Sequence, residues 1–570
     1  MKRVVYGFVF SFIILSSAYP QGKDQPDTLI QLNGVEIIDV LRKDKPYRMN
    51  CLDQSEIELS AARDIGDVLR KVPNVSGIRK GGTCLDPVVR GFKFNQLNVR
   101  INDGMKIEGG CPNRMDPTVA HIDVDDISKI EVIKGPFALR YGPNLGGIIN
   151  IKTMQPQLRD SFEIHIKAIQ GYESNWNGNK EHLAVYGGSK RIYFLLSGNR
   201  KKYNDYKDGN GEVVSSAFTK YNYTAQLSAS PFNGHQVILF YDESHGRNVM
   251  YPALPMDERI DDTRLMSLDY KISKVSDVFN DLHFKIYQSD VLHEMDNKER
   301  PFSDTVVAVS KINAINFGYR IETHLKFGKN SIWIGTDHEN ISKDGDRTKT
   351  RILEPTMPVM REKLWNNAKI TNYGIFSEFS RSFNKLNLIT AVRLDINSAT
   401  SGNLLLKKKE NIIYSNDSVD SDHINFSFSI GGIYFINKKL SLSLALGRGA
   451  RSPDMVERFI ILLPIGYDNY DYLGNPQLDP EVNSEADLSV KYVSHSAGVF
   501  DAGIFYSYVV NYITGKHVPP SQVKPQSKDV VGVKQFYNED YVHLMGFEFL
   551  YQSPASYKWG VNASAAYTAG

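Results

Sequence analysis

Cysteine is scarce in this 570-residue chain, which has only 3, and the charges nearly cancel, with 67 basic and 65 acidic side chains. Three cysteines are too few for a disulfide scaffold or for an all-cysteine zinc site. A net charge of +2 excludes a strongly basic nucleic-acid binder, so we expect no nucleic-acid partner. Because the chain also lacks a nucleophile elbow and a Walker loop, the sequence gives no support to an enzyme.

Long hydrophobic runs are absent apart from one at the N-terminus. Lys2 and Arg3 precede an apolar run, Val4–Leu15, which small residues follow at positions 16–18. This layout predicts a secretory signal over residues 1–18, and the run is shorter than the about 20 residues of a spanning helix. The mature chain should therefore leave the cytoplasm, either as a soluble protein or as a membrane β-barrel.

Aromatic residues and glycine are plentiful, with 31 Tyr, 28 Phe and 43 Gly at a mean hydropathy of −0.33. From residue 161 onward, about 17 runs alternate polar and apolar residues, as in Phe162–Lys167. Short connections between these runs take turns with long ones, such as Gly246–Asp262 and Lys343–Ala368. The pattern predicts an all-β transmembrane barrel over residues 159–570, with short periplasmic turns and long outer loops.

Residues 46–158 predict a compact α+β domain in front of the barrel. Asp64–Val75 has the pattern of an amphipathic helix that Pro73 ends, and Leu97–Ile101, Ile127–Ile133 and Ile148–Ile151 read as strands. A polar leader, residues 19–45, contains one extended apolar stretch, Gln31–Ile38. That stretch is either a strand that pairs with another protein's sheet edge or an ordinary first strand.

Several short motifs of this domain resemble one family. Glu131–Pro136, Tyr141–Gly142 and Gly146–Ile151 are similar to the plug-domain signature of TonB-dependent outer-membrane receptors, and Gly474–Glu481 is similar to a barrel segment of that family. The resemblance implies an N-terminal plug inside a 22-stranded barrel in the outer membrane of a Gram-negative bacterium. It also implies a TonB box near residues 31–38, with Leu32, Val35, Glu36, Ile37 and Ile38, as the contact for TonB with ExbB and ExbD.

The count of about 17 strands is smaller than the 22 of the family. A 17-stranded open sheet would leave unpaired edges in lipid, where backbone groups have no water to bind. We therefore expect the chain to be truncated at its C-terminus.

The plug segment Gly109–Pro117 contains the clearest candidate for a binding site. Cys111 and Met115 lie four residues apart, so both sulfurs can face one point if the segment coils. Thiolate and thioether are soft ligands that select Cu(I), whereas zinc sites prefer Cys, His and carboxylate. The alternative is a buried free cysteine that packs near a gap-filling methionine.

A His-x-Met pattern occurs twice in the barrel, and strand alternation separates the two copies. His293 and Met295 fall on the polar, lumen-facing side of their strand, at the outer end of the seventh strand. His543 and Met545 share a face with Phe547 and therefore point to lipid. A plug segment that faces outward can meet the first pair but not the second.

Together, these residues resemble the copper-importing, OprC-like branch of the family, in which a plug CxxxM and a barrel HxM bind one copper. The resemblance implies that copper, as Cu(I), is the cargo, bound by Cys111, Met115, His293 and Met295 and imported to the periplasm. Four methionines on predicted outer loops are candidate auxiliary ligands or simple packing residues: Met250, Met256, Met357 and Met360.

Other readings stay open. The cargo can instead be a siderophore, haem or another metal chelate, for which the loop residues Tyr251, Tyr467, Tyr470 and Tyr472 would be suitable contacts. A protein of another class, a structural or adhesive surface barrel, is the third reading. Cys51 and Cys84 can pair as a plug disulfide in an oxidising compartment, and His121 is expected to be structural.

Overall fold

The computed structural model describes residues 45–408, 411–465, 467–527, 530–554 and 559–570. The predicted signal sequence and the predicted TonB box, Leu32, Val35, Glu36, Ile37 and Ile38, lie outside the described residues. In the described ranges, no helix is both long and apolar enough to cross a membrane.

The N-terminal part folds around a four-stranded sheet in the order β1-β6-β7-β5, in which β5 and β7 are parallel. A second sheet joins β2, β3 and β4. The strands are β1 Met49–Asp53, β2 Val75–Arg79, β3 Leu85–Val89, β4 Phe92–Lys93, β5 Leu97–Ile101, β6 Ile127–Lys134 and β7 Gly147–Thr153. The helices are α2 Gln54–Leu59, α3 Ile65–Leu69, and the short 3-10 turns η1 Phe94–Gln96, η2 Thr118–Ala120, η3 Val124–Asp126 and η4 Leu139–Tyr141.

The three predicted strands are present as β5, β6 and β7, whereas β1 to β4 were not predicted and the helix is shorter than expected. The side chain of Asp64 caps α3 by accepting the amide of Asp67, and α3 ends at Leu69 instead of continuing to Pro73. Pro73 disfavours helical backbone at the residue before it, and Asn74 has a φ of 55°, so the chain turns directly into β2.

Eighteen strands form one closed barrel that follows the chain order. They are β8 Glu163–Glu173, β9 Gly178–Gly188, β10 Ile192–Tyr203, β13 Phe218–Ala229, β14 His235–Val249, β15 Asp257–Ser273, β16 Phe279–Asp296, β17 Val306–Phe327, β18 Asn330–Arg351, β19 Met360–Ser382, β20 Leu386–Thr400, β23 Ser421–Phe435, β24 Leu440–Arg451, β25 Asp471–Leu473, β26 Glu481–Ser494, β27 Gly498–Val518, β28 Val533–Gln552 and β29 Asn562–Ala569. Seventeen of them are wall strands, as predicted, and β25 is a three-residue addition that pairs with β28 in parallel.

The long connections carry small elements of their own. Two hairpins, β11–β12 and β21–β22, a 3-10 turn η5 and a helix α4 lie between wall strands. Their bounds are β11 Tyr206–Lys207, β12 Val213–Val214, β21 Leu404–Lys408, β22 Asn411–Asn416, η5 Pro301–Asp304 and α4 Met455–Phe459.

Several wall strands are longer than predicted. β18 has 22 residues and β19 has 23, so most of the predicted loop Lys343–Ala368 is strand. A strand needs only about 9–11 residues to cross a bilayer. Beyond the apolar layer, the pairing continues without the alternating lipid-facing pattern, and the sequence therefore gave no sign of it.

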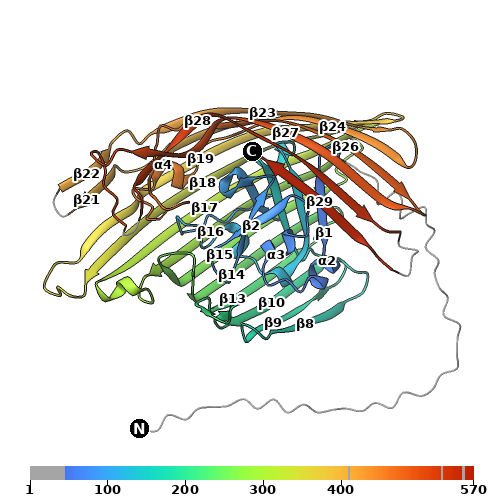
Figure 1. The fold of residues 1–570 in the computed structure, drawn as a ribbon. Coiled ribbons are helices and arrows are strands. Elements are labelled where there is room, and N and C mark those ends of the chain that lie inside the picture. Colours follow the sequence, from blue (N-terminus) through green and yellow to red (C-terminus); the bar gives the residue numbers. More distant parts are fainter. Residues whose placement is uncertain (1–44, 409–410, 466, 528–529, 555–558) are drawn as a thin grey trace, which may run out of the picture. The chain divides into compact units, whose positions relative to one another are not determined.

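The N-terminal part lies inside the ring of barrel strands, where it appears in blue in Figure 1. Ion pairs connect the two parts: the buried guanidinium of Arg90 contacts Glu485, Asp487 and Glu548 at 2.7, 2.8 and 2.9 Å. Apolar side chains such as Ile164 and Ile166 are exposed on the other face of the wall, as a lipid-facing surface requires.

Candidate metal centre

The loop Gly109–Pro117 rises from the plug and presents Cys111 and Met115, both buried. Asp116 folds the loop back on itself, because its carboxylate accepts the amides of Gly110 at 2.5 Å and Cys111 at 2.8 Å. A Cβ at Gly110 would lie 2.5 Å from the Cβ of His293. Only glycine at position 110 lets the loop come this close to the barrel wall.

Strand β16 contributes the barrel side of the centre. His293 and Met295 alternate onto the inner face and are 0% and 4% exposed. The Sγ of Cys111 lies 4.0 Å from the Sδ of Met295. All four residues that the sequence singled out are thus buried where the plug loop meets β16.

His293 has unusual surroundings for a buried imidazole. Neither ring nitrogen has a hydrogen-bond partner, although both are buried. Three carboxylates surround Nδ1 at longer range: Asp261 at 3.5 Å, Asp116 at 3.6 Å and Glu258 at 4.0 Å. A buried polar atom without a hydrogen-bond partner calls for an explanation, and a bound water or ion is one.

Sequence reasoning did not find these three carboxylates. Asp261 lies directly opposite His293 in the β15–β16 ladder. Glu258 would point outward by simple alternation from Asp261, but the register shifts between Glu258 and Ile260 and turns it inward. Asp116 was visible within the Gly109–Pro117 segment, but only the fold places it beside a histidine from the barrel.

Two further side chains fix the loop to the wall. The Nε2 of His121 donates to the carbonyl of Asp116 at 3.0 Å, and its Nδ1 lies 2.8 Å from the hydroxyl of Thr263, so both ring nitrogens contact groups of the protein. Burial raises the pKa of Tyr251 well above its ordinary value. Its hydroxyl consequently stays protonated and donates to the carbonyl of Met115 at 2.8 Å.

The four candidate auxiliary methionines have different positions. Met256 is buried in the same apolar cluster as Cys111, Met115 and Met295, together with Trp365 and residues of the α4 segment such as Met455. Met357 is 52% exposed between β18 and β19. Met250 lies between β14 and β15, and Met360 is the first residue of β19 rather than part of a loop.

The proposed plug disulfide is absent, and the second His-x-Met pair lies elsewhere. Cys51, Cys84 and Cys111 are all free, Cys51 being exposed and Cys84 buried. Met545 is 51% exposed on the outer face of β28, and His543 is exposed beside it. Strand alternation therefore separated the two pairs as expected.

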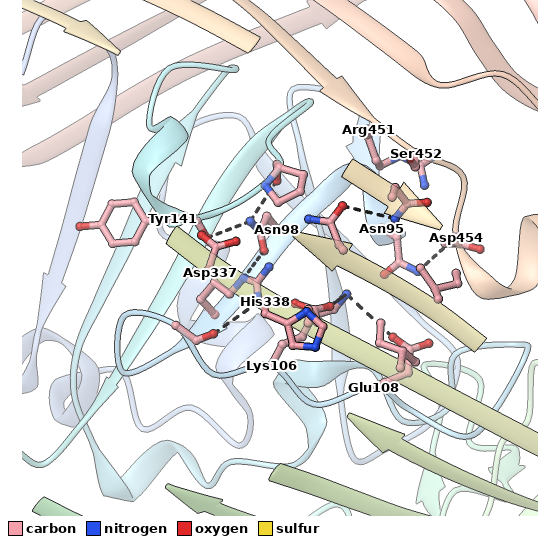
Figure 2. A pocket seen from close by; sticks show the side chains of 18 of the residues that line it. Asn95, Asn98, Lys106, Glu108, Tyr141, Asp337, His338, Arg451, Ser452 and Asp454 are labelled. Atoms are coloured by element: carbon pink, nitrogen blue, oxygen red, sulfur yellow. Dashed lines mark hydrogen bonds and ion pairs between the residues drawn. The ribbon is translucent and has the colours of Figure 1, made fainter. Parts of the chain in front are cut away.

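A polar cavity lies next to the centre, between the plug and strands β17–β20 and β24 (Figure 2). Its volume is about 120 Å³. Lys106 and Arg100 of the plug both pair with Glu339 of β18, at 3.2 and 2.7 Å, and Glu108 pairs with Lys343 at 2.8 Å. These pairs hold the segment that leads into the Cys111 loop against the wall.

Comparisons with known proteins identify the class. A family model described as TonB dependent receptor-like, beta-barrel, matches residues 170–569, and the TonB-dependent receptor plug domain matches residues 41–148. The chain therefore belongs to the TonB-dependent receptor family. Proteins of this family are transporters of the Gram-negative outer membrane and not enzymes, and this chain is an outer-membrane barrel with a plug.

Individual relatives are distant. The fold is shared with the copper transporter OprC, at a TM-score of 0.79 and 22% identity, over 91% of this chain and 80% of that one. It is also shared with the hemophore receptor HasR of Serratia marcescens, at a TM-score of 0.75 and 14% identity, over 92% and 82%. A vitamin B12 transporter, BtuB of Vibrio vulnificus, is 25% identical over 260 residues, 42% of this chain. That match spans only 41% of the relative's length.

Proposed function

We propose that this receptor binds copper as Cu(I) and imports it into the periplasm. The proposed ligands are Cys111 and Met115 of the plug with His293 and Met295 of the barrel. The proposal rests on two observations. Cys111, Met115 and Met295 share one buried apolar cluster, with 4.0 Å between the sulfurs of Cys111 and Met295. The imidazole of His293, which has no hydrogen-bond partner, lies near Cys111. Thiolate and thioether ligands favour Cu(I), and the thiol would lose its proton on binding.

The position of these ligands suggests how a tightly bound ion is released. Two come from the plug and two from the wall, so a movement of the plug separates the set. TonB, with ExbB and ExbD, would supply that movement through the Leu32–Ile38 segment. Strong binding alone would otherwise oppose release into the periplasm.

A chelate cargo is the second candidate, and the names of the haem and vitamin B12 relatives favour it. The polar cavity beside the plug, of about 120 Å³, is small beside the roughly 300–1,000 Å³ of sites for organic ligands. A second cavity, of about 410 Å³, is lined by none of the residues 109–117. Tyr467 and Tyr472 also pack against each other, with ring centroids 5.6 Å apart, and Tyr472 is buried. Both observations support a bare ion over a chelate. A structural or adhesive barrel would bind neither.

The test is the copper content of the purified receptor after reconstitution with copper under reducing conditions. We expect about one tightly held copper per chain, lost in Cys111→Ala and in His293→Ala because each removes a ligand. The lipid-facing His543→Ala is the matched control and should keep its copper. Absence of copper, or copper that neither inner variant affects, would refute the four-ligand centre. In a receptor that binds copper, deletion of Leu32–Ile38 should abolish copper uptake and leave copper binding intact.

A further inference from the structure

We infer that Asp116 gives this centre a second binding mode, in which Cys111, His293 and Asp116 hold a divalent cation of the zinc class. The inference goes beyond the proposed copper function but shares two residues with it. Cys111 and His293 are ligands in both modes. Methionine sulfurs complete the site for a soft ion, and the Asp116 carboxylate completes it for a harder one.

The geometry is that of a three-ligand site. The Sγ of Cys111, a carboxylate oxygen of Asp116 and a ring nitrogen of His293 all lie within 4.8 Å of one another. Tetrahedral zinc with bonds of about 2.0–2.3 Å places neighbouring ligand atoms roughly 3.3–3.7 Å apart. The distance from Asp116 Oδ2 to His293 Nδ1 is 3.6 Å, which is too long for a hydrogen bond and suitable for a pair bridged by a metal.

The donor chemistry supports the same conclusion. Thiolate, imidazole and carboxylate are the three side-chain ligands of zinc, and thioether is not among them. His293 is fully buried, and neither of its ring nitrogens has a hydrogen-bond partner that would compete with an ion. Asp116 is already held in place by the amides of Gly110 and Cys111, and it therefore needs no rearrangement to act as a ligand.

The charge around the imidazole favours a divalent over a monovalent ion. Asp116, Glu258 and Asp261 are at most 4% exposed, and all lie within 4.0 Å of His293 Nδ1. An oxygen of Asp261 also lacks a hydrogen-bond partner. Buried charge is costly unless it is compensated, and the thiolate that Cys111 forms on binding an ion adds to it. A divalent cation offsets twice as much of this charge as Cu(I).

Because the two modes share Cys111 and His293, they exclude each other. The structure therefore predicts competition: Zn²⁺ occupies the centre until Cu(I), which has the stronger preference for sulfur, displaces it. The choice of cation then depends on ligands that can be changed separately: Asp116 for divalent ions, and Met295 with Met115 for Cu(I).

The test is a titration of the purified full-length receptor with Co²⁺ under anaerobic, reducing conditions, followed by Zn²⁺. Co²⁺ reports a thiolate ligand through a charge-transfer band and a tetrahedral site through its visible bands. We expect one Co²⁺ per chain, displaced by Zn²⁺. Asp116→Asn should weaken Co²⁺ and Zn²⁺ binding by at least about tenfold, and by clearly more than it weakens Cu(I) binding. Met295→Leu should do the reverse, and the lipid-facing Met545→Leu should change neither.

Each result decides between the two functions. A Co²⁺ spectrum without the thiolate band, or one that Asp116→Asn leaves unchanged, overturns the divalent mode. If Asp116→Asn loses both ions because its loop moves, Met295→Leu gives the decision: retained Co²⁺ supports the mode and lost Co²⁺ overturns it. Co²⁺ binding without any Cu(I) binding would instead refute the copper function and leave the divalent site standing.

Discussion

The two His-x-Met pairs of this barrel have the same local sequence pattern and opposite surroundings. His293 and Met295 end β16 on its inner face and are at most 4% exposed, whereas Met545 on β28 is 51% exposed. His543 has a partner, the hydroxyl of Tyr506 at 2.6 Å, and its ring packs near Tyr508 and Tyr541. His293 has only carboxylates at longer range.

A short motif in a β-barrel can therefore be interpreted only when the face of the strand on which its side chains lie is known. A shift by one residue moves a side chain from the lumen to lipid. On the outer face, histidine and tyrosine form a polar-tipped aromatic surface of the kind found at membrane interfaces. On the inner face, His293 and Met295 instead meet a plug loop that carries two sulfurs.

The largest test of this contrast places the same lysine at both methionines. In Met295→Lys, an ammonium replaces a soft ligand beside buried carboxylates that can pair with it, so we expect copper affinity to fall by at least about a hundredfold with little loss of stability. In Met545→Lys, copper binding should persist, and the barrel should lose up to about 2–4 kcal/mol because a charge faces lipid. Copper titration and heat-induced unfolding in detergent measure the two effects.

The opposite pattern would contradict the assignment of faces. Copper loss in Met545→Lys, or unchanged copper in Met295→Lys, would mean that the two strands do not have the orientations described here. Met295→Leu and Met545→Leu serve as uncharged controls for side-chain volume.

A smaller effect is expected from Gly110→Ala, which disturbs the inner pair without replacing a proposed ligand. The added Cβ would meet the Cβ of His293 at 2.5 Å, and neither atom is the end of a flexible chain. The Cys111 loop must therefore shift, and we expect copper affinity to fall by about tenfold. Gly209→Ala is the control, because a Cβ there meets nothing within 4 Å. Wild-type affinity in Gly110→Ala would show that the loop does not need this close approach.

Much of this centre could be predicted from sequence because it rests on local rules. Alternation assigned His293 to the lumen, and four-residue spacing brought Cys111 and Met115 to one loop. The carboxylates could not be predicted in the same way. Asp261 depends on the β15–β16 register, Glu258 depends on a bulge, and Asp116 acquires its neighbour only when the plug docks.

The fold shows the same division. The wall strands followed from alternating runs, while the extensions of β18 and β19 beyond the bilayer did not, because pairing there no longer requires an apolar face. Helix α3 was predicted too long because the residues before Pro73 form turns instead of continuing the helix. Local sequence patterns therefore predict the strands and helices, whereas the side-chain contacts between them depend on long-range strand register.

The smallest expected effect concerns Lys80, a plug residue whose ammonium donates to the carbonyl of Asn113 at 2.6 Å, within the Gly109–Pro117 loop. Burial lowers the pKa of Lys80 to about 8, from an ordinary value of 10.5. Between these two pH values, the unfolded chain holds a proton that the folded chain has released, so the free energy of unfolding rises with pH. The cost of burying the charge is fully present below pH 8 and is gone by pH 10.5.

Lys80→Met removes this dependence, and the comparison of its unfolding midpoint with that of the wild type measures the cost. We expect the unfolding midpoint of the wild type to rise relative to that of the variant by about 1–2 °C as the pH rises from 8 to 10.5. A difference that stays constant over this window would mean that Lys80 keeps its ordinary pKa and that water reaches its ammonium. That result would also concern the candidate metal centre, because it would place water next to the Cys111 loop. A bound ion there needs a site that is dry and negatively charged.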